Sequence, residues 1–144
     1  MKRAIFSLAL AIAFIAGVSA QEKPNFAGTW KSSGSFNSWT ITVEGNKMTV
    51  TMMVAGNSDS TVYLLDGTPS TKAFEGPNGP AENIYTSTWE GDVLVTAIKT
   101  AFGTVLIEKR SIEPDGTMKV QTTLTIPGKP SPPPGPPLVL KRVG

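Results

Sequence analysis

Few side chains in this sequence could carry out nucleophilic or acid–base chemistry. The chain contains no His and no Cys, which excludes Ser-His-Asp and Cys-His catalysis, ordinary zinc sites and haem ligation by these residues. A pair of carboxylates could still act as acid and base, and Glu90 and Asp92 are close in sequence. They flank Gly91 in a predicted hairpin turn, however, where we expect both to be solvated. The same is expected of three carboxylates in other predicted turns: Asp59, Asp66 and Asp115.

Motifs for metal binding and phosphate binding are also absent from the sequence. The sequence has no Asp-x-Asp calcium loop and no glycine-rich phosphate loop preceding a helix. We therefore predict that the protein is not an enzyme and has no metal and no cofactor. Any function must then come from binding, and the elements that could form a binding site are strands.

Almost every segment after residue 27 has the pattern of a β-strand. In "SWTITVEGNKMTVTMMV", apolar and polar residues alternate on either side of Gly45-Asn46, a pair typical of a tight hairpin turn. Similar turn-forming residues recur at Asp66-Gly67, Glu90 to Asp92, Phe102-Gly103 and Pro114 to Gly116. The stretch "EGPNGPAEN" is expected to form a longer loop. The pattern predicts an all-β fold without helices in the mature chain.

The connections indicate how these strands are arranged. Eight to ten short strands with short connections favour an antiparallel up-and-down meander, and closing such a sheet into a barrel removes its exposed edges. A two-sheet β-sandwich is the alternative architecture. The second face of the strands is mostly Thr, Lys, Glu and Gln, which argues against membrane insertion of the mature domain.

The first twenty residues have a different composition. Lys2 and Arg3 precede an apolar run, and Val18-Ser19-Ala20 places small residues at a cleavage site. We expect residues 1–20 to be a signal peptide and residues 21–144 to form one exported domain, periplasmic or extracellular. Lys2 and Arg3 account for the excess of 13 basic over 11 acidic residues, so the mature chain is formally neutral. This balance gives no indication of nucleic-acid binding.

A proline-rich segment, residues 127–137, interrupts the last predicted hairpin. Its composition favours an extended polyproline II conformation without ladder hydrogen bonds. It could dock into an aromatic-lined groove of another protein. We favour a stiff exposed loop, because the apolar residues Leu138 and Leu140 follow at once and return the chain to the barrel.

Three motifs together resemble a known superfamily. "FAGTWK" (residues 26–31), "WEGDVLV" (residues 89–95) and the final strand "LVLKRV" (residues 138–143) resemble lipocalin-like calycins, especially uncharacterised secreted bacterial proteins with a Gly-Thr-Trp-Lys first strand. The resemblance implies that Trp30 packs across one end of the barrel beneath a basic side chain of the last strand. Leu138, Leu140 and Arg142 share one face of that strand, so Arg142 is the expected partner, and Gly28 allows close backbone approach.

The sequence also departs from one branch of that superfamily. Fatty-acid-binding proteins hold a ligand carboxylate with an Arg-x-Tyr pair, and the matching positions here are Leu138 and Leu140. The helical lid that follows their first strand is also missing, because only "SSGSFN" separates the strands of Trp30 and Trp39.

The predicted binding site is the barrel interior, at the end opposite Trp30. Met adapts its shape and Trp offers flat area, as many apolar ligand sites require, although the same residues could fill a dry core. We predict that a small hydrophobic molecule binds there. The alternative is a non-enzymatic interaction or inhibitor-like module that acts through its loops. The predicted interior residues are Trp39, Ile41, Met48, Val50, Met52, Val120 and Leu124.

Overall fold

The computed structural model describes residues 22–144, so the predicted signal peptide, residues 1–20, lies outside the described part. Within residues 22–144 there is no helix, and hence no helix long and apolar enough to cross a membrane. The ten strands are β1 (Gly28–Ser32), β2 (Ser38–Glu44), β3 (Lys47–Val54), β4 (Asn57–Leu64), β5 (Ser70–Gly76), β6 (Gly79–Glu90), β7 (Val93–Lys99), β8 (Val105–Ile112), β9 (Met118–Thr125) and β10 (Leu138–Val143).

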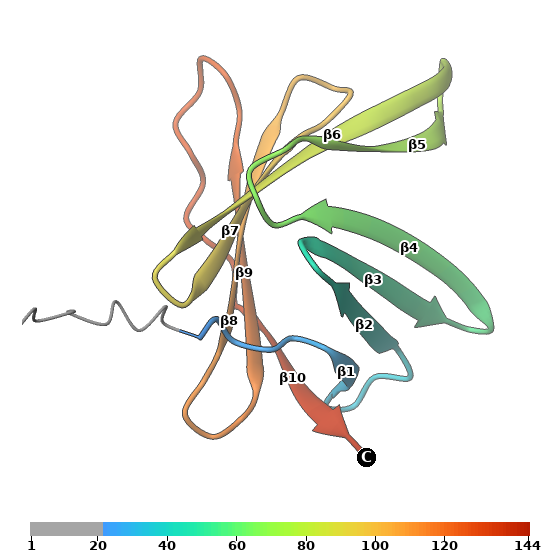
Figure 1. Ribbon diagram of the computed structural model, residues 1–144. Coiled ribbons are helices and arrows are strands. Elements are labelled where there is room, and N and C mark those ends of the chain that lie inside the picture. Colours follow the sequence, from blue (N-terminus) through green and yellow to red (C-terminus); the bar gives the residue numbers. More distant parts are fainter. Residues whose placement is uncertain (1–21) are drawn as a thin grey trace, which may run out of the picture.

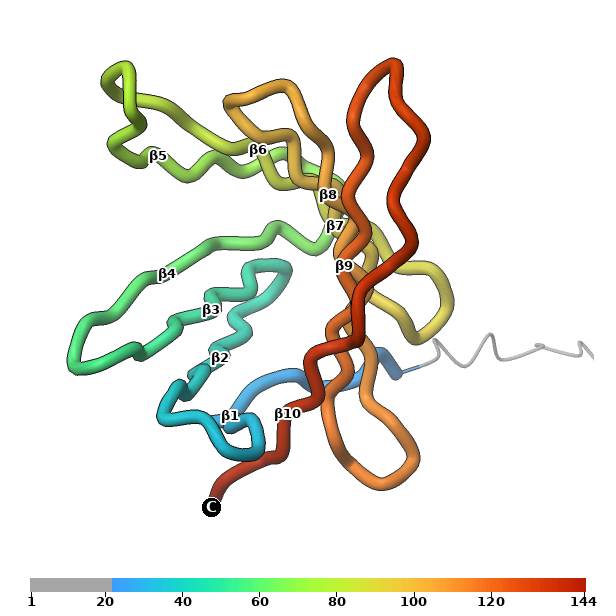
Figure 2. The backbone as a smooth tube through the Cα atoms, turned by 180° about the vertical axis from the view of Figure 1, so that it is seen from behind, coloured from blue at the N-terminus to red at the C-terminus, as the bar shows by residue number. Residues whose placement is uncertain are grey.

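These strands form one antiparallel sheet that curls into a nearly closed barrel (Figure 1). Strands that are consecutive in the chain pair with each other, except β4 and β5, and the first strand, β1, also pairs with the last, β10. No ladder joins β4 to β5 within the described residues, and Figure 2 shows the β3–β4 and β5–β6 hairpins diverging at this seam. The all-β meander barrel of the prediction is confirmed, with a seam in place of full closure.

Tight turns set the register of the hairpins. The chain reverses between β2 and β3 at Gly45-Asn46, where Gly45 has a φ of 61° that favours glycine. The prediction of a longer loop at "EGPNGPAEN" is wrong. Only Pro77 and Asn78 connect β5 to β6, and Glu75 pairs with Pro80. The two prolines made this stretch resemble a loop, but Pro80 lies at the hairpin end of its strand, where a missing ladder hydrogen bond costs little.

One end of the barrel is filled by a compact apolar core. Trp30 of β1 is fully buried, and its indole Nε1 donates a 2.9 Å hydrogen bond to the carbonyl oxygen of Phe26. Phe26 is also buried, and its ring stacks on Trp89 with centroids 5.8 Å apart. The segment before β1 thus crosses this end of the barrel and closes it.

The last strand completes the same end. Trp30 and Arg142 are partners in the β1–β10 register, and the guanidinium carbon of Arg142 lies 4.6 Å from the Trp30 ring centroid. Arg142 also donates a 3.1 Å hydrogen bond to the Asn25 carbonyl. Gly28 has a φ of 134°, a conformation that residues with a Cβ rarely adopt, and an added Cβ would lie 3.9 Å from the Arg142 side chain. The structure therefore brings Gly28, Trp30 and Arg142 together.

Candidate functional site

A cavity of about 320 Å³ lies inside the barrel, between two walls. Strands β2, β3 and β4 form one wall, and β8, β9 and β10 form the other. Leu138, at the start of β10, lines the cavity, whereas Arg142, near the end of the same strand, covers Trp30. The cavity is thus displaced from the closed end. Its lining residues are Trp39, Val50, Met52, Asp59, Thr61, Tyr63, Glu108, Arg110, Val120, Thr122, Pro136, Leu138 and Leu140.

The predicted interior residues divide into two groups. Four of them line the cavity: Trp39, Val50, Met52 and Val120. Ile41 and Met48 are almost fully buried and belong to the core that contains Trp30, so they support the site from outside the cavity lining. Leu124 is half-buried on the same face of β9 as Val120, but it does not line the cavity.

The polar part of the lining was not predicted from the sequence. Glu108 and Arg110 lie on one face of β8, between Leu106 and Ile112. This face points into the barrel, because Arg110 pairs with the buried residues Leu94 and Val120. The other face of β8 carries Val105 and Ile107, so hydrophobic alternation alone does not show which face is inside. Knowledge of the register between β8 and β9 would have shown that Glu108 and Arg110 lie inside the barrel.

Arg110 is the most deeply buried charged side chain of the site, with only 5% of its surface exposed. Its Nη2 donates a 3.0 Å hydrogen bond to Oε1 of Glu108, and its Nη1 lies 3.3 Å from the sulfur of Met118. Its Nε is buried and has no hydrogen-bond partner among the described residues. A buried donor without a partner costs roughly 1–3 kcal/mol, and Arg110 itself lines the cavity.

Tyr63 lies beside this charged pair. Its ring centroid is 5.8 Å from the guanidinium carbon of Arg110, and its side chain is almost completely buried. Burial, reinforced by the negative charge of Glu108, raises the pKa of the Tyr63 hydroxyl well above its ordinary value. The hydroxyl therefore stays neutral over the whole physiological pH range, and it keeps its proton as a hydrogen-bond donor.

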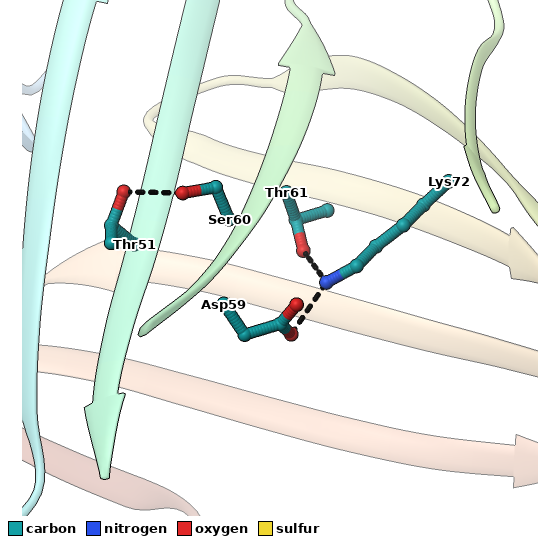
Figure 3. Close-up of polar contacts among 5 residues, drawn as sticks. All are labelled: Thr51, Asp59, Ser60, Thr61 and Lys72. Carbon is teal, nitrogen blue, oxygen red and sulfur yellow. Dashed lines mark hydrogen bonds and ion pairs between the residues drawn. The ribbon is translucent and has the colours of Figure 1, made fainter. Parts of the chain in front are cut away.

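A second charged pair lies at the seam between β4 and β5. Lys72 Nζ of β5 lies 2.5 Å from Oδ2 of Asp59 and 3.0 Å from Oγ1 of Thr61, both on β4 (Figure 3). Nearer the connection between the two strands, Ser70 Oγ donates a 2.6 Å hydrogen bond to the Val62 carbonyl. Side chains thus bridge the seam where the backbone ladder is missing, and two of them, Asp59 and Thr61, also line the cavity.

The expectation that Asp59 lies in a turn is wrong, although its side chain is exposed, as expected. The chain already reverses at Ala55-Gly56, where Ala55 has a φ of 49° and Gly56 a φ of 82°. Strand β4 therefore begins at Asn57, and Met52 pairs with Asp59. Glu90 and Asp92 do flank a hairpin turn and are exposed, and Asp66 and Asp115 are exposed residues between strands.

Hydrogen bonds from nearby threonines favour the ionised form of two of these carboxylates. Asp66 accepts a hydrogen bond from the Thr68 amide, and Asp115 accepts hydrogen bonds from the amide and hydroxyl of Thr117. Hydrogen bonds to Thr68 and Thr117 lower the pKa of Asp66 and Asp115, respectively. Both carboxylates thus act as turn residues that hold the backbone. No group of three or more potential metal ligands occurs among the described residues.

The fold is similar to several solved structures. A REP1-NXSQ fatty acid transporter aligns with a TM-score of 0.58 and 15% identity, over 82% of this chain and 96% of that one. Secretory abundant heat soluble protein 4 from Ramazzottius varieornatus aligns with a TM-score of 0.56 and 13% identity, over 86% of this chain and 99% of that one. At these identities the likeness shows a shared lipocalin-like barrel fold.

Comparisons of the sequence give a different result. No protein-family model and no curated protein matches it. What the chain does must therefore be argued from its cavity.

Proposed function

We propose that the protein is an exported, non-enzymatic, lipocalin-like carrier that binds a small, mainly apolar molecule in the barrel cavity. The observation that carries this proposal is the cavity itself, whose two walls present Trp39, Val50, Met52, Val120 and Leu140 to the same space. Its volume of about 320 Å³ is near the lower end of the roughly 300–1,000 Å³ typical of ligand pockets. The ligand is accordingly small.

Two further observations support the proposal. The polar and charged lining residues lie mostly on β4 and β8, so that donors and acceptors placed there can orient a ligand whose apolar part contacts the other strands. A structural neighbour is described as a fatty acid transporter, so a barrel of this kind can serve an apolar cargo. The predicted signal peptide, residues 1–20, supports a periplasmic or extracellular location.

The alternative function, interaction with another protein through the loops, has one structural feature in its favour. The proline-rich segment, residues 127–137, is exposed along its whole length. The same segment also contributes Pro136 to the cavity lining, and Gln121 Nε2 donates a 2.7 Å hydrogen bond to the Gly135 carbonyl. In the proposed function, this segment therefore forms part of the cavity rim and contributes to ligand binding.

Binding of an uncharged dye that fluoresces in apolar surroundings tests the proposal. We expect one saturable site in the wild-type protein and its loss in the Thr122→Trp variant. Thr122 lines the cavity and is itself exposed, so the larger side chain fills the cavity without displacing the buried core.

The matched control is Thr123→Trp, the next residue along β9, whose side chain lies on the other face of the strand. This variant should bind the dye like the wild type. Equal binding by the wild type and both variants, or no saturable binding by the wild type, would contradict a ligand site in the cavity.

A further inference from the structure

The charges at the cavity are balanced pair by pair. Arg110 is paired with Glu108, whose side chain is 14% exposed, and Lys72 is paired with Asp59 across the seam. Figure 3 shows Lys72 directed at both Asp59 and Thr61. Each cation at the site thus already has a carboxylate partner supplied by the protein itself.

The donor that remains at the cavity belongs to a neutralised pair. Arg110 lines the cavity, is 5% exposed, and has an Nε with no partner among the described residues. A ligand that satisfies this donor must offer a hydrogen-bond acceptor. The hydroxyl of Tyr63, whose pKa is raised mainly by burial, is neutral and adds no charge beside Arg110.

The charge of the acceptor decides how well it fits. A ligand carboxylate at Arg110 would be a second anion beside Glu108, in surroundings where charges are poorly screened and like charges are costly. An ester or ketone oxygen would satisfy the same donor without that repulsion. The apolar residues Leu138 and Leu140 of β10 line the cavity opposite β4 and add no further cation.

We propose that the cavity selects an uncharged, mainly apolar molecule that carries one hydrogen-bond acceptor of the ester or ketone type, in preference to a carboxylate with the same hydrocarbon chain. The acceptor oxygen binds the guanidinium group of Arg110, and the hydrocarbon part contacts Trp39, Val50 and Val120. This inference rests on the proposed function, because it specifies the ligand of the same cavity.

Competition against the uncharged dye, with three compounds of one medium-length alkyl chain, tests this selectivity at neutral pH. The compounds are the methyl ester, the carboxylate and the plain hydrocarbon. We expect the ester to displace the dye about two- to tenfold better than the hydrocarbon, as one net hydrogen bond would allow. We expect it to exceed the carboxylate by roughly tenfold or more, because of the repulsion from Glu108.

The Glu108→Gln variant identifies the cause of the selectivity. The amide retains an oxygen acceptor for Arg110 but removes the negative charge, so the carboxylate should gain roughly tenfold or more while the ester changes little. Glu90→Gln is the matched control, because Glu90 is exposed at the end of β6 and does not line the cavity. It should keep the wild-type order of the three compounds.

Two results would overturn the inference while leaving the proposed function intact. One is a wild-type preference for the carboxylate, and the other is a Glu108→Gln variant with an unchanged ratio of ester to carboxylate. If the Glu108→Gln variant does not fold, the wild-type comparison of ester, carboxylate and hydrocarbon decides alone. Failure of the dye to bind the wild type at a saturable site would instead overturn the proposed function, and the selectivity would fall with it.

Discussion

Arg110 and Tyr63 are the two polar residues of the cavity lining that are almost completely buried. Arg110 keeps a buried donor without a partner, and Tyr63 keeps its proton because burial raises the pKa of its hydroxyl. Both side chains lie among residues that exclude water, including Met118, Leu140 and Met48. Hydrogen bonds made there by a ligand would meet little competition from solvent.

The raised pKa of Tyr63 predicts a loss of stability in alkaline solution. The unfolded chain loses the phenol proton near the ordinary pKa of 10.0, while the folded protein still holds it. The contribution to stability is therefore complete below pH 10 and declines as the pH rises above it, by about 1.4 kcal/mol per pH unit.

Urea unfolding of the wild type and the Tyr63→Phe variant between pH 8 and pH 11 measures this effect. The free energy of unfolding of the wild type should fall more steeply above pH 10 than that of the variant, while the two curves run parallel at pH 8 to 9. Parallel curves up to pH 11 would show that Tyr63 does not hold its proton in the folded protein.

Some residues of the site could be predicted from the sequence and others could not. Trp39, Val50, Met52 and Val120 follow from strict alternation beside a clear turn, and all four line the cavity. The charged residues Asp59, Glu108 and Arg110 were missed because charge normally indicates an exposed position, and because the exact start of β4 depends on a two-residue turn at Ala55-Gly56. Polar residues inside a barrel become visible only through the register of neighbouring strands.

At the scale of elements, β1 and β10 are the strands that close the barrel. Their pairing places Arg142 over Trp30, and the segment before β1 contributes Phe26 to the same cluster. This pairing joins the two ends of the described chain and is therefore the longest-range contact in the sheet. Motifs at both ends of the sequence pointed to it, whereas no motif indicated that the seam would fall between β4 and β5.

Removing the Trp30 side chain should lower stability strongly. Trp30 is fully buried, and truncation of a buried Trp to Ala typically lowers the free energy of unfolding by about 3–5 kcal/mol. Denaturant unfolding of Trp30→Ala measures the loss. Trp39→Ala is the matched comparison, because Trp39 is half-buried at the cavity; it should lose less stability and bind the dye more weakly. A stable Trp30→Ala variant that fails to bind the dye would contradict this assignment of roles.

The whole molecule has two regions with different physical properties. The closed end is packed with Trp30, Phe26 and Met118, and it holds the barrel together. The cavity lies away from this end, between β2–β4 and β8–β10, and it borders the seam bridged by Lys72 and Asp59. A stable closed end allows the other end to keep a cavity that packing does not fill.

Methyl chemical-shift mapping by NMR, during titration with the methyl ester, tests whether an uncharged ligand binds inside the barrel. Binding in the cavity should cause large shifts for its methyl groups, on Val50, Met52 and Val120. The methyl groups of Val93 and Val95, which lie on the outer face of β7 on either side of the buried Leu94, should change little. Shifts confined to the outer face or to the loops, with the cavity methyl groups unchanged, would contradict binding in the cavity.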